Sequence, residues 1–85
     1  DETGRILRFT LWPGQSVREH SAPHSPVYIV VLKGRGLFAG GEGPEQEFGP
    51  NTLLTFAAGE GHAITALDED LVFVAFLHGA PGAQR

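Results

Sequence analysis

The chain has 85 residues, of which 41% are hydrophobic and 19% charged, and it contains no Cys. A chain of this length predicts one domain over residues 1–85, with its core in about residues 6–78. Without Cys, disulfides, Cys-based zinc sites, iron–sulfur clusters and thiol catalysis are excluded. Six basic and ten acidic residues give a formal net charge of −4. This balance argues against a nucleic-acid-binding protein, which needs a basic stripe.

The charges are unevenly distributed, because no basic residue lies between Arg35 and Arg85 while most of the acidic residues do. Either the two signs interleave on a solvated surface, or the molecule has an acidic face. The longest apolar runs are far shorter than the roughly 20 residues that span a bilayer. A signal-peptide pattern is also absent. We therefore expect a cytoplasmic protein that binds neither membranes nor nucleic acid.

Turn signals rich in Gly, Pro and Asp recur along the chain and separate short segments rich in β-branched and aromatic residues. No interval between them is long enough and free enough of Gly and Pro to form a helix of three turns. About eight short strands with regular turns predict an all-β, jelly-roll barrel of antiparallel strands. The expected strands are Ile6–Trp12, Ser16–Glu19, Val27–Lys33, Gly36–Ala39, Glu45–Phe48, Thr52–Ala57, His62–Leu67 and Leu71–His78.

Two of these segments contain runs that are apolar on both faces, Val27–Leu32 and Leu71–Leu77. An antiparallel strand with one wet face alternates between apolar and polar residues. Both runs therefore need cover from outside the barrel. We expect a homodimer to supply it; flanking terminal segments of the same chain are the alternative.

Gly34–Ala39 formally matches the dinucleotide-binding pattern G-x-G-x-x-A. That pattern must open a helix, but Gly40, Gly41, Gly43 and Pro44 follow at once. The glycines are better explained by a hairpin turn with positive φ.

His20 and His62 lie at strand ends, where a side chain can face the mouth of a small barrel. The pattern G-x5-H-x-H-x4-E-x6-G aligns without a gap on Gly14, His20 and Gly34. The pattern G-x5-P-x-G-x2-H-x3-N aligns on Gly59 and His62. With the strand and turn segment VYIVVLKGRG between them, these matches resemble a small single-domain cupin.

The sequence departs from the cupin motifs at several positions. Metal-binding cupins use three His and one Glu, and here Ala22 replaces the second His and Val27 the Glu. Ala57 and Ala66 also replace the Pro and Asn of the second motif. Two imidazoles alone make a weak site for Fe, Mn, Ni or Zn.

His24 is the candidate replacement, because its loop can fold over the barrel mouth. His20, His24 and His62 would then form a three-His site for a divalent transition metal. The alternative is a metal-free pocket. Glu60 is expected to point to solvent, and His78 to be structural or exposed.

With Val27 in place of Glu, the expected ligand-binding interior is apolar. Its candidate residues are Val27, Ile29, Phe38, Phe56 and Ile64, with Leu53 and Phe73 as further candidates. The alternative is that the same residues form an ordinary hydrophobic core with no space for a ligand. Three functions remain open: a module that binds a small molecule without turnover, a metal-dependent dioxygenase- or isomerase-like enzyme, and a structural or regulatory partner of another protein.

Overall fold

The computed structural model describes residues 4–20 and 26–78, which form eight strands and no helix. None of the described segments therefore has the length and hydropathy of a membrane-spanning helix. Each expected strand is present, with ends that differ from the prediction by no more than two residues. The strands are β1 (Gly4–Leu11), β2 (Ser16–His20), β3 (Val27–Lys33), β4 (Gly36–Gly40), β5 (Gln46–Phe48), β6 (Leu53–Phe56), β7 (Gly61–Ala66) and β8 (Leu71–His78).

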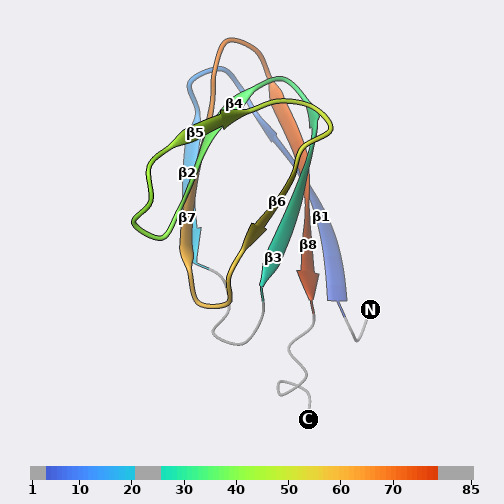
Figure 1. Cartoon of the computed structure of the whole chain (residues 1–85). Coiled ribbons are helices and arrows are strands. Elements are labelled where there is room, and N and C mark those ends of the chain that lie inside the picture. The colour runs from blue at the N-terminus through green and yellow to red at the C-terminus, as the bar shows by residue number, and fades with distance from the viewer. Residues whose placement is uncertain (1–3, 21–25, 79–85) are drawn as a thin grey trace.

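The strands pair into two four-stranded sheets that face each other (Figure 1). One sheet has the order β1-β8-β3-β6 and the other the order β2-β7-β4-β5. The pairings among these eight described strands are antiparallel, and their register shifts between Val31 and Lys33, where β3 pairs with β8. This architecture confirms the all-β, jelly-roll prediction.

The turn after β3 differs from the prediction. Gly34 does have a positive φ of 80°, and a Cβ there would overlap the carbonyl oxygen of Asp70. However, β3 and β4 belong to different sheets, so the turn connects the two sheets and closes no hairpin. Gly36 has no positive φ; it is needed because a Cβ would lie 2.6 Å from the side chain of Leu71.

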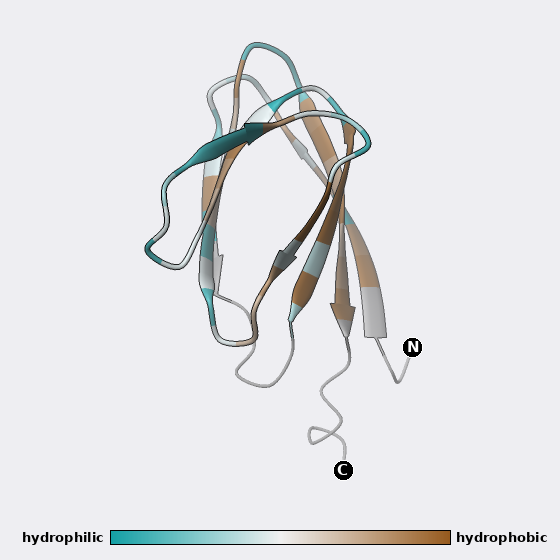
Figure 2. Cartoon of the chain, viewed as in Figure 1, coloured by the Kyte–Doolittle hydropathy of each residue, from teal (hydrophilic) through white to brown (hydrophobic). Residues whose placement is uncertain are grey.

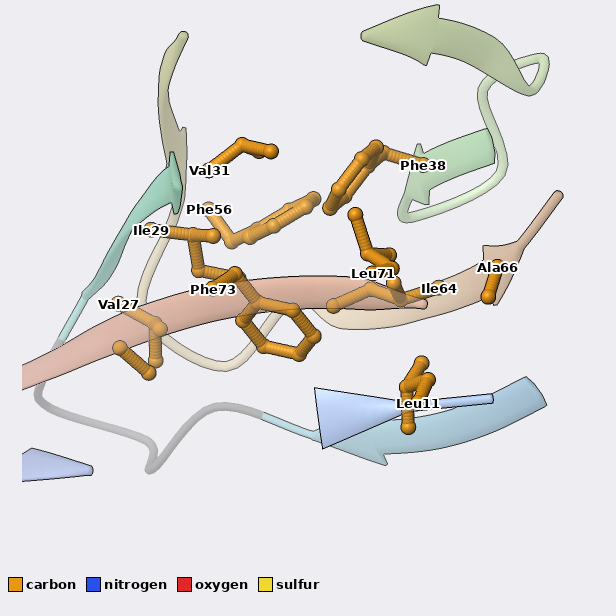
Figure 3. Close-up of a cluster of buried hydrophobic side chains, with 11 residues drawn as sticks. Leu11, Val27, Ile29, Val31, Phe38, Phe56, Ile64, Ala66, Leu71 and Phe73 are labelled. Atoms are coloured by element: carbon orange, nitrogen blue, oxygen red, sulfur yellow. The ribbon is translucent and has the colours of Figure 1, made fainter. Parts of the chain in front are cut away.

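The core lies between the sheets and is apolar (Figure 3). Phe38 of β4 meets Phe73 of β8 edge to face, with ring centroids 6.4 Å apart, and so joins the two sheets. Phe9 of β1 also stacks on Phe73 at 5.1 Å. Burial of aromatic and aliphatic side chains of this size contributes about 1.5–3 kcal/mol each, which gives a domain without disulfides its main stabilisation.

Alternation along β6 places Leu54 and Phe56 against the core and leaves Leu53 exposed. The expectation that Leu53 lines the interior is therefore wrong. Leu53 pairs with Val30, which is also on the side of the sheet that faces away from the core.

Candidate functional site at one end of the barrel

One end of the barrel holds the motif positions His20, Val27 and His62. Here β2 and β6 end, and β3 and β7 begin (Figure 1). The register pairs Val27 with Phe56 in one sheet and His20 with Gly61 in the other. These strand ends of the two sheets lie at the same end of the barrel (Figure 1).

His62, Ile64 and Ala66 follow one another at every second position of β7, so they share a face of the strand. Ile64 and Ala66 are buried, and His62 therefore lies on the inner side. Its ring stacks on the ring of Phe56 from the opposite sheet, with centroids 4.8 Å apart and planes inclined by 23°. The Nδ1 atom of His62 is buried. The imidazole is thus held against an apolar surface, with a fixed orientation.

Gly40 lies beside His62 in the register between β4 and β7. A Cβ on Gly40 would lie 2.9 Å from a ring carbon of Phe56 and 3.0 Å from Oε2 of Glu60. The missing side chain at this position therefore leaves the space that the aromatic ring and the carboxylate occupy next to His62.

Glu60 does not extend into solvent, contrary to the expectation from the sequence. Its Oε1 accepts a hydrogen bond of 2.7 Å from the backbone N–H of Ala57, while its backbone N–H donates to the carbonyl oxygen of Ala57 at 3.0 Å. The side chain therefore folds back across the turn between β6 and β7. Its Oε2 comes close to both Gly40 and Gly41. The sequence did not predict this placement. Its sequence indication is the pair Gly40 and Gly41, whose missing side chains leave room for the carboxylate.

All the predicted ligand-binding residues are buried in the core cluster: Val27, Ile29, Phe38, Phe56 and Ile64. Their burial shows that they face the interior; that they contact a ligand stays a prediction. Val27, at the position of the motif carboxylate, is only 4% exposed. An aliphatic side chain therefore fills the place of the usual acidic ligand.

The described residues alone do not fit a metal centre. Among the residues whose side chains the structure describes, 6–18 and 26–77, no three His, Asp or Glu side chains lie close enough to hold an ion. The backbone of β2 places Glu19 opposite His62 and His20 opposite Gly61. His24 lies outside the described residues. The side chain of His20 is not described either, so the three-His site remains a prediction.

Comparison with known proteins agrees with this two-sheet barrel. The family model of the cupin domain, Cupin_2, matches residues 7–77, so the chain belongs to this cupin family. Its motifs are degenerate at Ala22 and Val27. No protein of curated function matches the chain by sequence.

Solved structures share the fold at low sequence identity. An uncharacterised protein with a double-stranded β-helix domain from Klebsiella pneumoniae superposes with a TM-score of 0.87 at 18% identity, over 94% of this chain and 70% of that one. An RmlC-like cupin from Methanocaldococcus jannaschii gives 0.84 at 14% identity, over 99% and 77%. A predicted oxalate decarboxylase from Thermotoga maritima gives 0.80 at 25% identity, over 89% and 67%.

Proposed function

We propose that the protein binds a small, mostly apolar molecule at the barrel end that holds His62, without turnover of its own. The observation that carries this proposal is the stacking of His62 on Phe56, with the Glu60 carboxylate beside Gly40. An apolar surface with a few convergent polar groups is the usual composition of a small-molecule site. The aliphatic side chain at Val27 favours an apolar ligand body.

The polar groups define the kind of ligand. An ionised carboxylate only accepts hydrogen bonds, whereas a neutral imidazole has one donor and one acceptor nitrogen. A hydroxyl or amino group can donate to Glu60 and also interact with His62. A negatively charged group would be repelled by Glu60. We therefore propose small aliphatic or aromatic alcohols and amines as the ligand class.

A thermal-shift screen with such alcohols and amines, and with matched carboxylic acids, tests this function. We expect at least one alcohol or amine to raise the melting temperature, and the His62→Ala variant to lose that shift. The control is Asp68→Asn, an exposed residue in the turn before β8. A shift that survives in His62→Ala, or a preference for the acids, would contradict the proposal.

The second candidate function is a metal-dependent enzyme. Membership of the cupin family and the likeness to a predicted oxalate decarboxylase support it. His20, His24 and His62 would hold the ion, which could be Zn, Fe, Mn or Ni. A metal bound there would polarise a substrate or activate water or O₂.

Elemental analysis of the purified protein separates the two functions. The enzyme hypothesis expects close to one equivalent of a transition metal, lost in His24→Ala and retained in the matched control His78→Ala. A metal content below about a tenth of an equivalent, after growth with added metals, would exclude tight binding of a metal at a structural or a catalytic site.

A further inference from the structure

The inner side of β1 carries apolar side chains that the opposite sheet covers only in part. Leu7, Phe9 and Leu11 pair with buried residues of β8, so they lie on the inner side of the sheet. Phe9 also stacks on the buried ring of Phe73. Yet the exposed fraction rises from 3% at Leu11 to 37% at Phe9 and 36% at Leu7. We call the two accessible residues, Leu7 and Phe9, the inner strip.

The paths of β1 and β2 account for this rise in exposure. The two strands are edges of different sheets, and a turn connects them, in which the backbone N–H of Gln15 donates to the carbonyl oxygen of Trp12 at 2.9 Å. Figure 1 shows β1 and β2 diverging from this turn toward the barrel end that holds His62. Leu11 lies next to the turn and is enclosed, whereas the inner strip lies where the two edges have separated.

The inner strip is continuous with the candidate site. The last inner row at this barrel end runs across neighbouring strands through Phe56, Val27 and Leu77. Phe56 carries the stacked ring of His62, and the partly buried Leu77 lies diagonally from Leu7. Figure 2 shows that hydrophobic residues dominate β8, the strand that joins this row to β1. With strands about 4.8 Å apart, the distance from Phe56 to β1 is roughly 14 Å.

The segments outside the described residues offer little apolar cover for the inner strip. Residues 1–3, 21–25 and 79–85 contain Ala and Pro but no larger apolar residue. Among the side chains that the structure describes, the strip and the row beside it carry no charge. A molecule that removes Leu7 and Phe9 from water must therefore present apolar surface to them.

We propose that the inner strip binds the apolar tail of a ligand whose polar head lies at His62. The tail site rests on the proposed function and narrows its ligand class to amphiphiles, with an amino or hydroxyl head on an unbranched apolar chain. A short ligand at the barrel end leaves Leu7 and Phe9 in water. A longer chain passes Leu77 and covers them, so that each added methylene strengthens binding.

The polar groups of the site set the orientation of such a ligand. Glu60 and His62 lie in and after the turn that follows β6, and β6 and β1 are opposite edges of the same sheet. An amino or hydroxyl group placed on the inner strip would lose its hydrogen bonds to water and gain none there, which is unfavourable. The head therefore lies at the β6 edge and the tail extends toward β1.

Titration calorimetry of the full chain with n-butylamine, n-octylamine and n-decylamine tests the proposal. A fully buried methylene strengthens binding about fourfold, so the dissociation constant should fall by about tenfold or more from the butyl to the decyl amine. His62→Ala should weaken the binding of all three amines. Leu7→Thr should weaken the decyl amine and leave the butyl amine unchanged. Threonine suits a partly exposed strand position, so this variant should fold, and circular dichroism checks this.

Ile6→Thr is the matched control, because Ile6 is the neighbour of Leu7 on the opposite side of β1 and is 67% exposed. It should leave the dependence on chain length unchanged. Amines that bind with no dependence on chain length, or a dependence that Ile6→Thr and Leu7→Thr reduce equally, would overturn the tail site and leave the proposed function standing. A polypeptide partner lost in Leu7→Thr, with the chain-length dependence intact, would also overturn it. If no amine or alcohol of any length binds, the proposed function fails and the tail site with it.

Discussion

The imidazole ring of His62 lies 4.8 Å from the ring of Phe56, and the two planes are inclined by only 23°. His62 belongs to β7 and Phe56 to β6, so this stacked pair connects the two sheets at the candidate site. It restrains the plane of the imidazole ring. It also makes the orientation of the candidate binding residue depend on a core residue.

A double-mutant cycle with Phe56→Leu and His62→Gln measures this coupling. Leucine is chosen at position 56 because Phe56→Ala would leave a cavity and cost about 3–5 kcal/mol of unfolding free energy. Phe56→Leu keeps most of the side-chain volume and should cost less. We expect a coupling energy of about 0.5–1.5 kcal/mol between the two sites from urea unfolding at fixed protein concentration. A coupling near zero would show that the stacked contact does not stabilise the fold.

Gly34 provides a test of the turn that joins the sheets. Its φ of 80° strains any other residue, and an added Cβ would overlap the carbonyl oxygen of Asp70. Gly14 has a similar φ of 83° but no atom within 4 Å of an added Cβ. Gly14→Ala should therefore show the backbone strain alone, on the order of 1–3 kcal/mol.

Gly34→Ala should lose the same amount of unfolding free energy through backbone strain. It should lose more because the backbone at Asp70 must move, so its melting temperature should fall further than that of Gly14→Ala. Thermal unfolding followed by circular dichroism checks the difference. Equal losses in the two variants would show that the contact with Asp70 relaxes without cost.

Glu60 stabilises the turn between β6 and β7 through its hydrogen bond with the N–H of Ala57. Glu60→Ala removes the acceptor and should cost about 0.5–1.5 kcal/mol. Glu60→Gln retains a side-chain oxygen at the same position, so it should restore most of the lost stability. Urea unfolding of both variants provides the measurement. If Glu60→Gln is as destabilised as Glu60→Ala, the charge of the carboxylate stabilises the turn and the hydrogen bond does not.

Strand alternation predicted most of the interior correctly, because side chains in a strand point to opposite faces with a period of two. With the cupin motif setting the register, it placed Val27 and Ile29 of β3 inward, and both are buried. The same rule was ambiguous for β6, since the adjacent residues Leu53 and Leu54 are both apolar and point to opposite faces. Only the pairing of Leu53 with Val30 decides which leucine faces the core. Register between strands distant in sequence is not contained in the local pattern.

The placement of Glu60 was not predictable for a related reason. A charged residue in a Gly-rich turn normally faces solvent. Here Gly40 and Gly41, from a different hairpin, leave room for the carboxylate. The turn at Gly34 shows the same limit, since a positive φ suits both a hairpin and a connection between sheets. Local sequence therefore predicted the elements, and their packing determined the chemical neighbours of His62.

The ion pair between Arg35 and Glu47 tests how far surface charge contributes to stability. Arg35 Nε lies 2.6 Å from Glu47 Oε2, and the side chains remain 55% and 48% exposed. Exposed pairs of this kind contribute only about 0.2–1 kcal/mol, and salt screens them. Glu47→Gln should therefore lower the unfolding free energy within that range in dilute buffer, and by clearly less in about 1 M NaCl.

Arg35→Ala should cost more than Glu47→Gln, because the Arg35 side chain also packs against Gly49. That packing is independent of charge and should persist at high salt. Urea unfolding of the two variants at low and high NaCl separates the contributions. If the Arg35→Ala loss disappears in high salt, Arg35 acts only through its charge. If the Glu47→Gln loss is unchanged by salt, hydrogen-bond geometry at Glu47 dominates over the Coulombic attraction.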